Sequence, residues 1–404
     1  MKVSFAPPRM DQRVIDEVAD TLLSGWITTG PKTKRFEKEI SEYCNVPSTL
    51  CLNSATAGLE IMLRWYGVGE GDEVILPAYT YSATANVVIH CGATPVFADV
   101  KEDFNIDPLE VAKYITNKTK VIMPVDFGGL PCDYDALNAL VKSEAVKSKF
   151  KANSENQKKL NRILVLSDAA HSFGATQNRK YTGALTDVSV FSFHAVKNLT
   201  TAEGGAIALN LPAPFDNNEV YNYLCILTLH GQNKDALAKM QKGNWKYDII
   251  MAGYKCNMTD IMASIGLVEL SRYDETLEKR KLVVERYNGA FGKYSWAQLP
   301  HFKDAVNESC YHLYPIRIKN ASEVQRDAIM QKMFDKDVSV NVHFIPVPML
   351  SFYKNMGYDM NNYPKELDYY TREISLPVFY NLTDEQQQYV IDSLIESVNA
   401  VMGS

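Results

Sequence analysis

The chain has 404 residues, enough for two or three domains or for one large domain with a smaller partner. Hydrophobic residues make up 46% and charged residues 22%, which is ordinary for a globular protein with a large core. The net charge of -6, with both signs interspersed, argues against a nucleic-acid-binding protein. The sequence contains no run of about 18 apolar residues, so we expect no membrane-spanning helix.

The seven cysteines are scattered, are odd in number and form no CxxC pair. This predicts reduced, mostly buried thiols in a cytoplasmic protein. Cys44 and Cys51 lack nearby histidines, so we expect no metal site there or elsewhere. The first residues contain no apolar core of the kind found in signal peptides, which agrees with a cytoplasmic location.

Short apolar runs alternate with helical segments through the first two thirds of the chain. The runs that we predict as strands are residues 48–53, 72–77, 94–100, 120–127, 162–168, 187–193 and 204–210. Helices are predicted at 57–67 and in the Thr/Ala-rich segment after the second run. This alternation indicates βαβ units and a mainly parallel sheet. Ligands of such sheets bind beyond the carboxyl ends of the strands, so the residues that follow each run are candidates for a site.

The last third of the chain has a different pattern. The segment 143–162, which precedes this last third, is polar and lysine-rich. It predicts an exposed helix-plus-loop extension, and a partner-binding role is the alternative. The later elements are a long helix at 281–291, strands at 311–318 and 338–347, and helices near 322–336 and 383–401. These elements predict a smaller α+β domain. We therefore divide the chain into a large domain, 1–280, and a small domain, 281–404, on which the N-terminal segment could pack.

The residues after the first two runs suit a flat, anionic ligand. The segment 54–58 (SATAG) opens a helix, and its small residues would let backbone N–H groups approach an anion that the helix dipole favours. An ordinary serine N-cap is the alternative. Tyr79 or Tyr81, after the second run, could stack on a flat cofactor, although plain packing is the commoner role of such residues.

Two later residues complete the set. Asp168 ends a buried run and must be paired, hydrogen-bonded or neutral; it could hold a proton on a pyridine nitrogen or cap the next segment. Lys197 lies in a turn between two apolar runs, where burial would lower its pKa and make it a nucleophile toward an aldehyde. A lysine that reaches solvent is the alternative. An anion cradle, an aromatic, an acid and a nucleophilic lysine are together the parts that hold pyridoxal phosphate.

Seven segments, in this order and spacing, resemble a known family. They are residues 24–37, 53–61, 71–86, 92–100, 167–175, 191–206 and 253–270, with weaker matches at 311–318 and 342–348. The chain is similar to the pyridoxal phosphate-dependent sugar aminotransferases of the DegT/DnrJ/EryC/StrS group. The resemblance implies fold type I, that of aspartate aminotransferase: an α/β protein with a mainly parallel mixed sheet in the large domain and a small α+β C-terminal domain.

The resemblance also implies the catalytic residues. Lys197 corresponds to the Schiff-base lysine, and Asp168 to the partner of the pyridinium nitrogen. His171 corresponds to the neighbour that contacts the ring face or the phenolic oxygen of the cofactor. Tyr81 corresponds to the stacking aromatic, with Tyr79 on the opposite side of the strand.

Further cofactor contacts follow from the same resemblance. Ala55 and Thr56 match the pair that cradles the phosphate, and Ser192 adds a hydroxyl group. In the family each active site is completed by the other subunit of a homodimer, and the residues that match this contribution are Lys255 and Asn257.

The substrate side of the site is implied by two segments. The loop from Trp26 to Gly30, which includes Thr28 and Thr29, matches a loop near the sugar-binding cleft. His343 belongs to a motif that is associated with substrate contact.

The sequence departs from the family pattern at three places. Lys255 and Asn257 stand where many members have an asparagine and an arginine, so we expect altered phosphate contacts. Pro348 stands where many members have a histidine, so part of their sugar recognition is expected to be absent. The extension at 143–162 is longer than usual.

The resemblance implies an aminotransferase that converts a nucleotide-linked keto-deoxysugar to the amino sugar. L-glutamate would be the donor and 2-oxoglutarate the by-product, in the synthesis of surface polysaccharide such as lipopolysaccharide or of a related glycan. Residues 24–37 resemble members that aminate C4, so a 4-keto, UDP- or dTDP-linked sugar is expected. Lysine rather than histidine at Lys197 favours transamination over dehydration.

Other enzymes of the same fold, namely a lyase, a racemase or a desulfurase, and a non-catalytic homologue are the alternatives. A nicotinamide-dependent dehydrogenase is disfavoured, because no GxGxxG follows the first strand.

Overall fold

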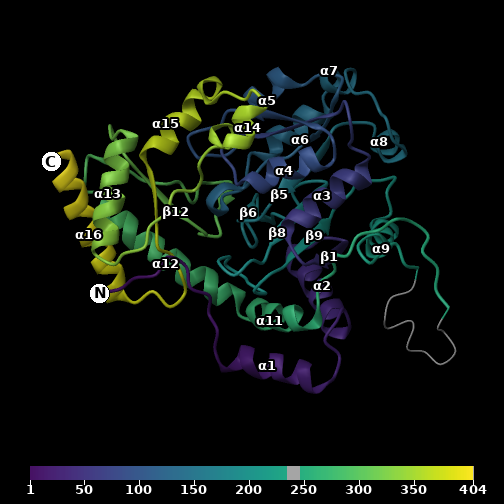
Figure 1. Cartoon of the computed structure of the whole chain (residues 1–404), viewed down its shortest axis with the longest axis horizontal. Helices are drawn as coiled ribbons and strands as arrows, with labels where there is room; N and C mark the ends of the chain where they lie inside the picture. Colours follow the sequence, from purple (N-terminus) through teal and green to yellow (C-terminus); the bar gives the residue numbers. More distant parts are fainter. Residues whose placement is uncertain (234–245, 404) are drawn as a thin grey trace.

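The computed structural model describes residues 1–233 and 246–403 and shows a central sheet between layers of helices (Figure 1). The strands of this sheet lie in the order β1-β9-β8-β5-β4-β2-β3. Their bounds are β1 (Ser48–Leu52), β2 (Glu73–Pro77), β3 (Thr94–Ala98), β4 (Thr119–Ile122), β5 (Leu164–Asp168), β8 (Val188–Ser192) and β9 (Gly205–Leu209). Strand β9 pairs antiparallel with β1 and β8, and the other neighbours pair in parallel. The predicted mainly parallel mixed sheet is confirmed.

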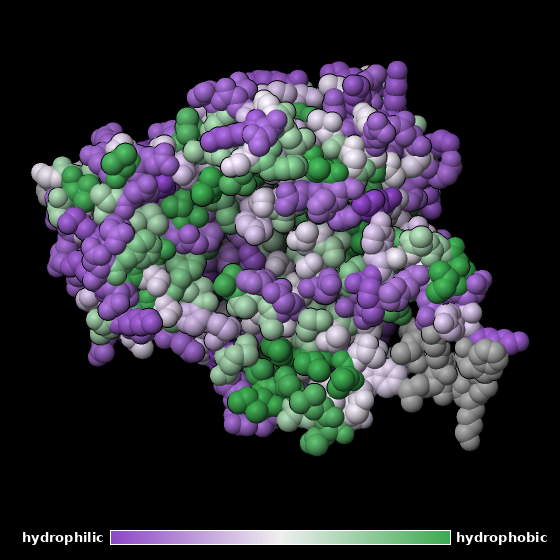
Figure 2. All heavy atoms as spheres, in the orientation of Figure 1, coloured by the Kyte–Doolittle hydropathy of each residue, from purple (hydrophilic) through white to green (hydrophobic). Residues whose placement is uncertain are grey.

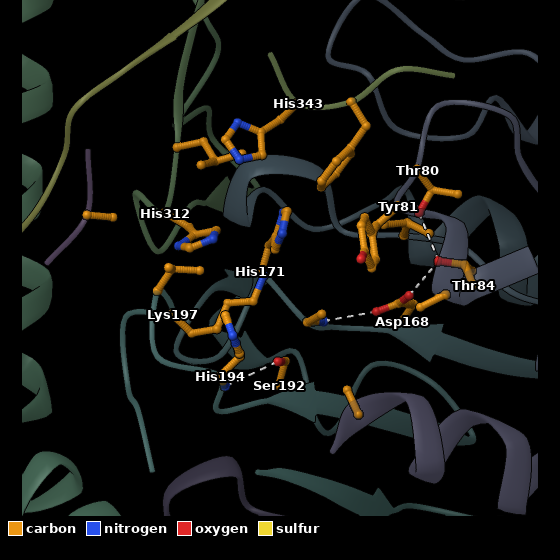
Figure 3. A pocket seen from close by; sticks show the side chains of 18 of the residues that line it. Thr80, Tyr81, Thr84, Asp168, His171, Ser192, His194, Lys197, His312 and His343 are labelled. Atoms are coloured by element: carbon orange, nitrogen blue, oxygen red, sulfur yellow. Dashed lines mark hydrogen bonds between the residues drawn. The ribbon is translucent and has the colours of Figure 1, made fainter. Parts of the chain in front are cut away.

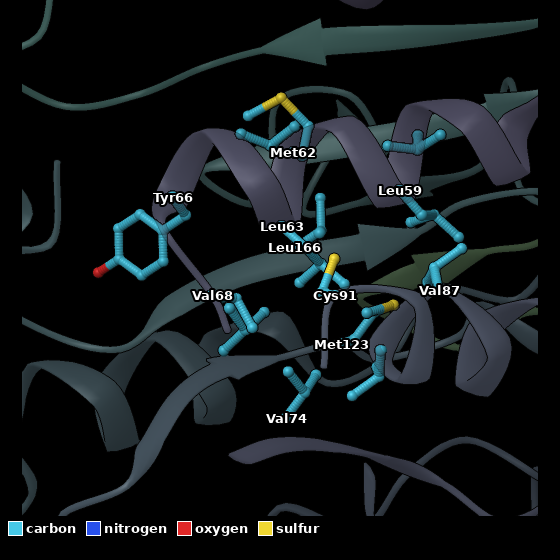
Figure 4. Close-up of a cluster of buried hydrophobic side chains, with 14 of the residues drawn as sticks. Leu59, Met62, Leu63, Tyr66, Val68, Val74, Val87, Cys91, Met123 and Leu166 are labelled. Atoms are coloured by element: carbon cyan, nitrogen blue, oxygen red, sulfur yellow. The ribbon is translucent and has the colours of Figure 1, made fainter. Parts of the chain in front are cut away.

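Helices cover both faces of the sheet and bury its side chains. Every residue of β1, β4, β5 and β9 is buried, which explains why these strands read as continuous apolar runs. The helices of this part of the chain are α1 (Gln12–Leu23), α2 (Pro31–Cys44), α3 (Ala55–Tyr66), α4 (Ser82–His90), α5 (Pro108–Tyr114), η1 (Phe127–Gly129), α6 (Tyr134–Lys142), α7 (Glu144–Lys147), α8 (Glu155–Leu160), α9 (Asn217–Leu227) and α11 (Asp260–Ser271). Figure 4 shows the largest core cluster, in which Leu59, Met62 and Leu63 of α3 lie over Leu166 of β5. This packing fixes the start of α3 at the edge of the sheet.

The polar extension at 143–162 forms a helix-plus-loop segment, as predicted, but it is more than an exposed appendage. Ser154 Oγ donates to the carbonyl of Tyr66 at 2.8 Å, and Gln157 Nε2 donates to the carbonyl of Gly67 at 3.2 Å. Gln157 is buried. The segment thereby satisfies carbonyl groups at the end of α3 that have no helical partner.

The C-terminal part has a core of its own around a second sheet. Its elements are α12 (Tyr273–Phe291), β10 (Ala297–Gln298), β12 (Tyr314–Ile318), α13 (Glu323–Asp335), η2 (Val347–Met349), α14 (Ser351–Asn355), η3 (Met360–Asn362), α15 (Pro364–Arg372), β13 (Glu373–Leu376) and α16 (Asp384–Met402). A three-stranded hairpin sheet of β6 (Thr176–Gln177), β7 (Lys180–Tyr181) and β11 (Asn307–Glu308) lies beside the central sheet. Val3 belongs to the C-terminal core cluster. The predicted boundary at 280/281 falls inside α12 and stays a prediction.

The predicted strand at 338–347 is wrong. Its residues make only isolated pairings, Val338 with Val3 and Asn341 with Ser375. Pro346 and Pro348 have no N–H to donate to a ladder, and the chain turns into η2 at Val347. The predicted helix at 281–291 likewise extends further back, because α12 begins at Tyr273. Within residues 1–233 and 246–403, no helix is both long and apolar enough to cross a membrane.

Candidate active site

A cavity of about 490 Å³ opens where the carboxyl ends of β1, β2, β5 and β8 meet the start of β9 (Figure 3). Parallel strands bring their carboxyl ends to one edge, and the antiparallel β9 brings its first residue to the same edge. The cavity gathers eight of the residues that the sequence singled out: Ala55, Thr56, Tyr81, Asp168, His171, Ser192, Lys197 and His343.

Lys197 lies in the turn that joins β8 to β9. The base of this turn is closed by hydrogen bonds from the Phe193 N–H to the Gly204 carbonyl and from the Thr201 N–H to the Phe193 carbonyl, both 2.9 Å long. Burial lowers the pKa of the Lys197 amine to about 8, although the carboxylate of Asp168 opposes the shift. A larger fraction of the amine is therefore neutral and nucleophilic than in an exposed lysine.

Asp168 is a buried carboxyl group held by two donors. Thr84 Oγ1 donates to Asp168 Oδ2 at 2.8 Å, and the N–H of Ala170 donates to Oδ1 at 3.2 Å. Thr84 Oγ1 also lies 2.9 Å from Thr80 Oγ1 (Figure 3). Burial raises the pKa of Asp168, while the Thr84 hydroxyl, the Ala170 N–H and the charge of Lys197 oppose the rise. The sequence analysis missed Thr84, which lies in the first turn of α4 and carries no distinguishing motif.

Three histidines surround Lys197. His171 Nδ1 accepts from the N–H of Gly128 at 3.3 Å, so the neutral ring carries its proton on Nε2. The His171 ring lies 4.5 Å from that of His312. Burial, and secondarily the charge of Lys197 and of neighbouring histidines, lowers the pKa of His171 and His312 well below the usual value and that of His343 to about 3. All three rings are neutral near neutral pH.

His312 is a further lining residue that the sequence analysis did not identify. Its Nδ1 lies 2.8 Å from Asn198 Oδ1, and Asn198 Nδ2 donates to the carbonyl of Cys310 at 2.7 Å. His312 thus holds the residue that follows Lys197. Its partner is more than a hundred residues away in the chain, so nothing in the local sequence indicated the contact.

The start of α3 offers backbone N–H groups that could bind an anion. Ser54 Oγ accepts from the N–H of Ala57 at 3.1 Å, and the N–H groups of Ala55 and Thr56 have no helical acceptor in this first turn. Gly205 lies against the turn: a Cβ added there would lie 2.5 Å from the nitrogen of Ala55. The absence of a side chain at Gly205 lets β9 approach the cradle closely.

The two tyrosines after β2 face opposite sides, as predicted. Tyr81 is 64% exposed and lines the cavity, with its ring 5.9 Å from that of Phe344. Tyr79 is fully buried and packs against Phe104 and Phe127. Of the two, only Tyr81 is placed where it could stack on a ligand.

Six predicted site residues do not line this cavity within the described parts of the chain: Trp26, Thr28, Thr29, Gly30, Lys255 and Asn257. They lie together instead. Lys255 Nζ bonds to Asn257 Oδ1, and Asn257 Nδ2 donates to Thr29 Oγ1 at 2.6 Å. Trp26 Nε1 donates to the carbonyl of Thr29 at 3.1 Å. We refer to these six residues as the outer cluster.

The residues present in the cavity fit pyridoxal phosphate. Lys197 offers an amine to the aldehyde, the Asp168 carboxyl group lies in the cavity wall where it could face the ring nitrogen, and the start of α3 offers N–H groups to the phosphate. In the described ranges, no group of three His, Cys, Asp or Glu side chains is placed to hold a metal ion.

Comparison with known proteins identifies the family. The family model described as the DegT/DnrJ/EryC1/StrS aminotransferase family matches residues 8–150 and 152–395. Spore coat polysaccharide biosynthesis protein SpsC of Bacillus subtilis (strain 168) is 35% identical over 403 residues, which are 98% of this chain and 96% of that protein.

Solved structures agree over the whole chain. The putative sugar aminotransferase Spr1654 of Streptococcus pneumoniae, in its PMP form, is 48% identical with a TM-score of 0.95, and the match covers 99% of this chain and 100% of that one. Helicobacter pylori PseC, an aminotransferase involved in the biosynthesis of pseudoaminic acid, is 27% identical with a TM-score of 0.86, over 99% and 100% of the two chains. The chain therefore belongs to the DegT/DnrJ/EryC1/StrS aminotransferase family and is a pyridoxal phosphate-dependent aminotransferase of fold type I.

Proposed function

We propose that this enzyme transfers the amino group of L-glutamate to the keto group of a nucleotide-linked keto-deoxysugar and releases 2-oxoglutarate. The acceptor is a 4-keto sugar linked to UDP or dTDP, and the amino sugar enters a surface polysaccharide or a related glycan. The descriptions of the relatives from S. pneumoniae, B. subtilis and H. pylori support a sugar substrate and a role in glycan synthesis. The resemblance of residues 24–37 to members that aminate C4 supports the keto position.

The charge of the cavity is the observation that carries the choice of a sugar acceptor. Among the described lining residues, Lys197 is the sole lysine or arginine, whereas Asp168 and Glu203 are both acidic. The other polar groups of the lining include His171, His312 and His343, which are neutral near neutral pH, and serine and threonine hydroxyl groups. Neutral histidines and hydroxyl groups instead suit the hydroxyl groups of a sugar.

The residues of the chain divide the chemical work. When bound, the cofactor supplies an electron sink that makes a C–H bond of the attached substrate acidic. Lys197 Nζ, with its pKa lowered to about 8, attaches the cofactor and later holds and moves the proton from that bond. Asp168 stabilises positive charge on the ring nitrogen, and the start of α3 binds the phosphate.

A homodimer with shared active sites is part of the proposal. Figure 2 shows hydrophobic side chains gathered over α1, where Ile15, Leu22 and Leu23 are exposed. Exposed apolar patches of this kind mark interaction surfaces. The outer cluster lies outside its own chain's cavity, and a second copy would let it complete the cavity of the partner. The seven free cysteines support the proposed cytoplasmic location.

A panel of nucleotide-linked keto-sugars tests the proposal. Each sugar is incubated with the enzyme and glutamate, and the amino sugar is detected by its mass. We expect amination of a 4-keto, UDP- or dTDP-linked member. The visible cofactor band could disappear when glutamate is added alone, while no sugar of the panel is aminated. That result would show an aminotransferase that uses glutamate but has another acceptor. A band that glutamate does not change would contradict glutamate as the amino donor.

Mixing two inactive variants tests the shared site. Lys197→Ala and Asn257→Ala proteins are combined after mild dissociation, and activity is compared with that of each alone. Shared sites predict partial recovery, because a mixed dimer has one site with both residues intact. No recovery from a confirmed mixed dimer would contradict the sharing.

A further inference from the structure

A line of three polar side chains connects a fully buried carboxyl group to the cavity. Glu373 and Ser375 lie on the same face of β13, and both are fully buried. Ser375 Oγ lies 2.5 Å from Glu373 Oε1 and 2.9 Å from Nδ1 of His343. His343 lines the cavity that contains Lys197 (Figure 3). Its ring stacks on that of Phe5. The line therefore runs from Glu373 through Ser375 to His343.

The backbone holds this line in place. The N–H of Ser375 donates to the carbonyl of Asn341 at 2.8 Å, and the N–H of Asn341 donates back to Ser375 at 3.1 Å. The other carboxylate oxygen of Glu373, Oε2, accepts from the backbone N–H of His343 at 3.0 Å. Each hydrogen-bonding atom along the line is thus fixed by the fold, and no loop movement is needed to form it.

The state of Glu373 determines which ring nitrogen of His343 carries the proton. If Glu373 is ionised, Ser375 donates to it, His343 Nδ1–H donates to Ser375, and Nε2 is left as an acceptor. If Glu373 is protonated on Oε1, it donates to Ser375, Ser375 donates to Nδ1, and Nε2 carries a proton. The ring is neutral in both cases, since burial lowers the pKa of His343 to about 3.

The surroundings of Glu373 keep it protonated at neutral pH. The facing charged or titratable groups are Arg317 on β12, Arg326 on α13, Tyr79 after β2, and His343. Arg326 Nη1 donates to the backbone carbonyls of Tyr370 and Glu373 rather than to the Glu373 carboxyl group. Burial raises the pKa of Glu373 to about 8, while Ser375, the His343 N–H and the two arginines oppose the rise.

We propose that Glu373, Ser375 and His343 form a proton relay that delivers a proton from the buried carboxyl group to an oxygen atom of the acceptor substrate through Nε2 of His343. This inference rests on the proposed function. When nitrogen replaces a ketone oxygen, that oxygen leaves as water and must gain protons. Nε2 gives one proton to this oxygen, Nδ1 takes the proton of Ser375, and Ser375 takes the proton of Glu373. The nitrogen that takes the place of this oxygen loses two protons in the same exchange. One of them passes to the oxygen, which leaves as water, and the other returns through His343 and Ser375 to the Glu373 carboxylate, so every proton is accounted for.

The tautomer of His343 tests the relay without any substrate. In the holoenzyme labelled with ¹⁵N-histidine, the two ring nitrogens are distinguished by their chemical shifts, and a His343→Gln variant assigns the signal. We expect the proton to move from Nε2 to Nδ1 as the pH rises through about 8. The same tautomer from about pH 6 to about pH 10 would overturn the proposal.

Glu373→Gln is the decisive variant. The glutamine amide would accept from the His343 N–H and donate to Ser375, which keeps the hydrogen-bonded shape but cannot pass a proton. We expect His343 to hold its proton on Nε2 at every pH, and kcat for the acceptor half-reaction to fall by about 10²-fold with little change in KM. Glu366→Gln is the matched control, because Glu366 is fully buried, accepts from the Ala78 N–H at 3.1 Å and has no contact with His343. It should keep the tautomer shift.

A purely structural role for Glu373 predicts a different result. In that case Glu373→Gln would keep both kcat and the pH response, and Ser375→Ala, which leaves Nδ1 without its partner, would act only on stability. Either result would overturn the relay. If no nucleotide-linked sugar is aminated, the proposed acceptor fails while the tautomer measurement still decides whether the relay exists.

Discussion

Replacement of Thr84 by valine isolates one hydrogen bond to Asp168. The Thr84 hydroxyl donates to Asp168 Oδ2 at 2.8 Å, and both side chains are buried. Valine keeps the shape of the side chain but removes the donor. A hydrogen bond to a charged group contributes about 1.5–3 kcal/mol, and one pKa unit corresponds to about 1.4 kcal/mol. Burial already raises the pKa of Asp168, and loss of this donor should raise it further.

The sign of the pH dependence follows from this shift. A carboxyl group whose pKa is raised by folding has its full stability below the unfolded pKa, near 3.8, and loses stability as the pH rises through the folded pKa. In Thr84→Val the folded pKa of Asp168 is higher still, so more stability is lost as the pH rises to neutral. The free energy of unfolding of the cofactor-free protein should fall by about 1.5–3 kcal/mol at neutral pH and much less in acid, where Asp168 is protonated. Urea unfolding at neutral pH and in acid measures the loss of free energy of unfolding under each condition.

Thr80→Val is the matched control. Its hydroxyl lies 2.9 Å from Thr84 Oγ1 and does not bond to Asp168, so a smaller loss is expected. The affinity for pyridoxal phosphate, followed by its absorbance, should fall by about tenfold or more in Thr84→Val, because the carboxylate that we propose to face the ring nitrogen is less stable. Equal effects of the two variants, or a stability loss that is the same in acid, would refute the reasoning.

Three further changes have expected outcomes. Lys197→Met should raise the melting temperature of the cofactor-free protein at neutral pH, with the gain vanishing above pH 10.5, because the buried amine has a pKa of about 8 when folded. The same variant should prevent borohydride from fixing the cofactor to the chain. Gly205→Ala should cost about 1–3 kcal/mol in urea unfolding, since its Cβ would lie 2.5 Å from the nitrogen that begins α3, whereas Gly289→Ala, with nothing within 4 Å, should be neutral or stabilising. Arg162→Met should cost about 3–5 kcal/mol, because it leaves the buried Asp187 without its partner at 2.6 Å, and a further Asp187→Leu change should recover part of that loss; no recovery would contradict a paired-charge explanation.

The central sheet could be predicted because its strands are buried on both faces and therefore appear as continuous apolar runs. The predicted runs at 162–168 and 204–210 correspond to β5 and β9 almost residue for residue. The run at 338–347 misled because Val338 and Val340 are buried like strand residues, yet Asn341 alone in that segment pairs with β13. Burial on one face does not by itself provide a neighbouring strand.

The site could be predicted where a residue's role follows from its place after a strand. Asp168 and Lys197 were identified in this way, and the cavity contains both. Thr84, His312 and Glu373 were not identified, because the residues that they contact in the site come from other parts of the chain. These contacts are with Asp168, Asn198 and His343, respectively. Thr84 lies in an ordinary helix, His312 lies just before a strand, and Glu373 begins a strand, so the local sequence indicates no special role for them.

The reversed direction of β9 has a consequence for how this enzyme assembles. Residues 193–204 leave β8 and return as its neighbour β9, so the loop that carries Lys197 is anchored at both ends in strands that are paired on both sides. The nucleophile cannot reach its working position before these strands have joined. Amide hydrogens at the base of the loop should therefore exchange with solvent at the rate at which the whole domain unfolds. During refolding, the chain should bind pyridoxal phosphate only after β8 and β9 have paired.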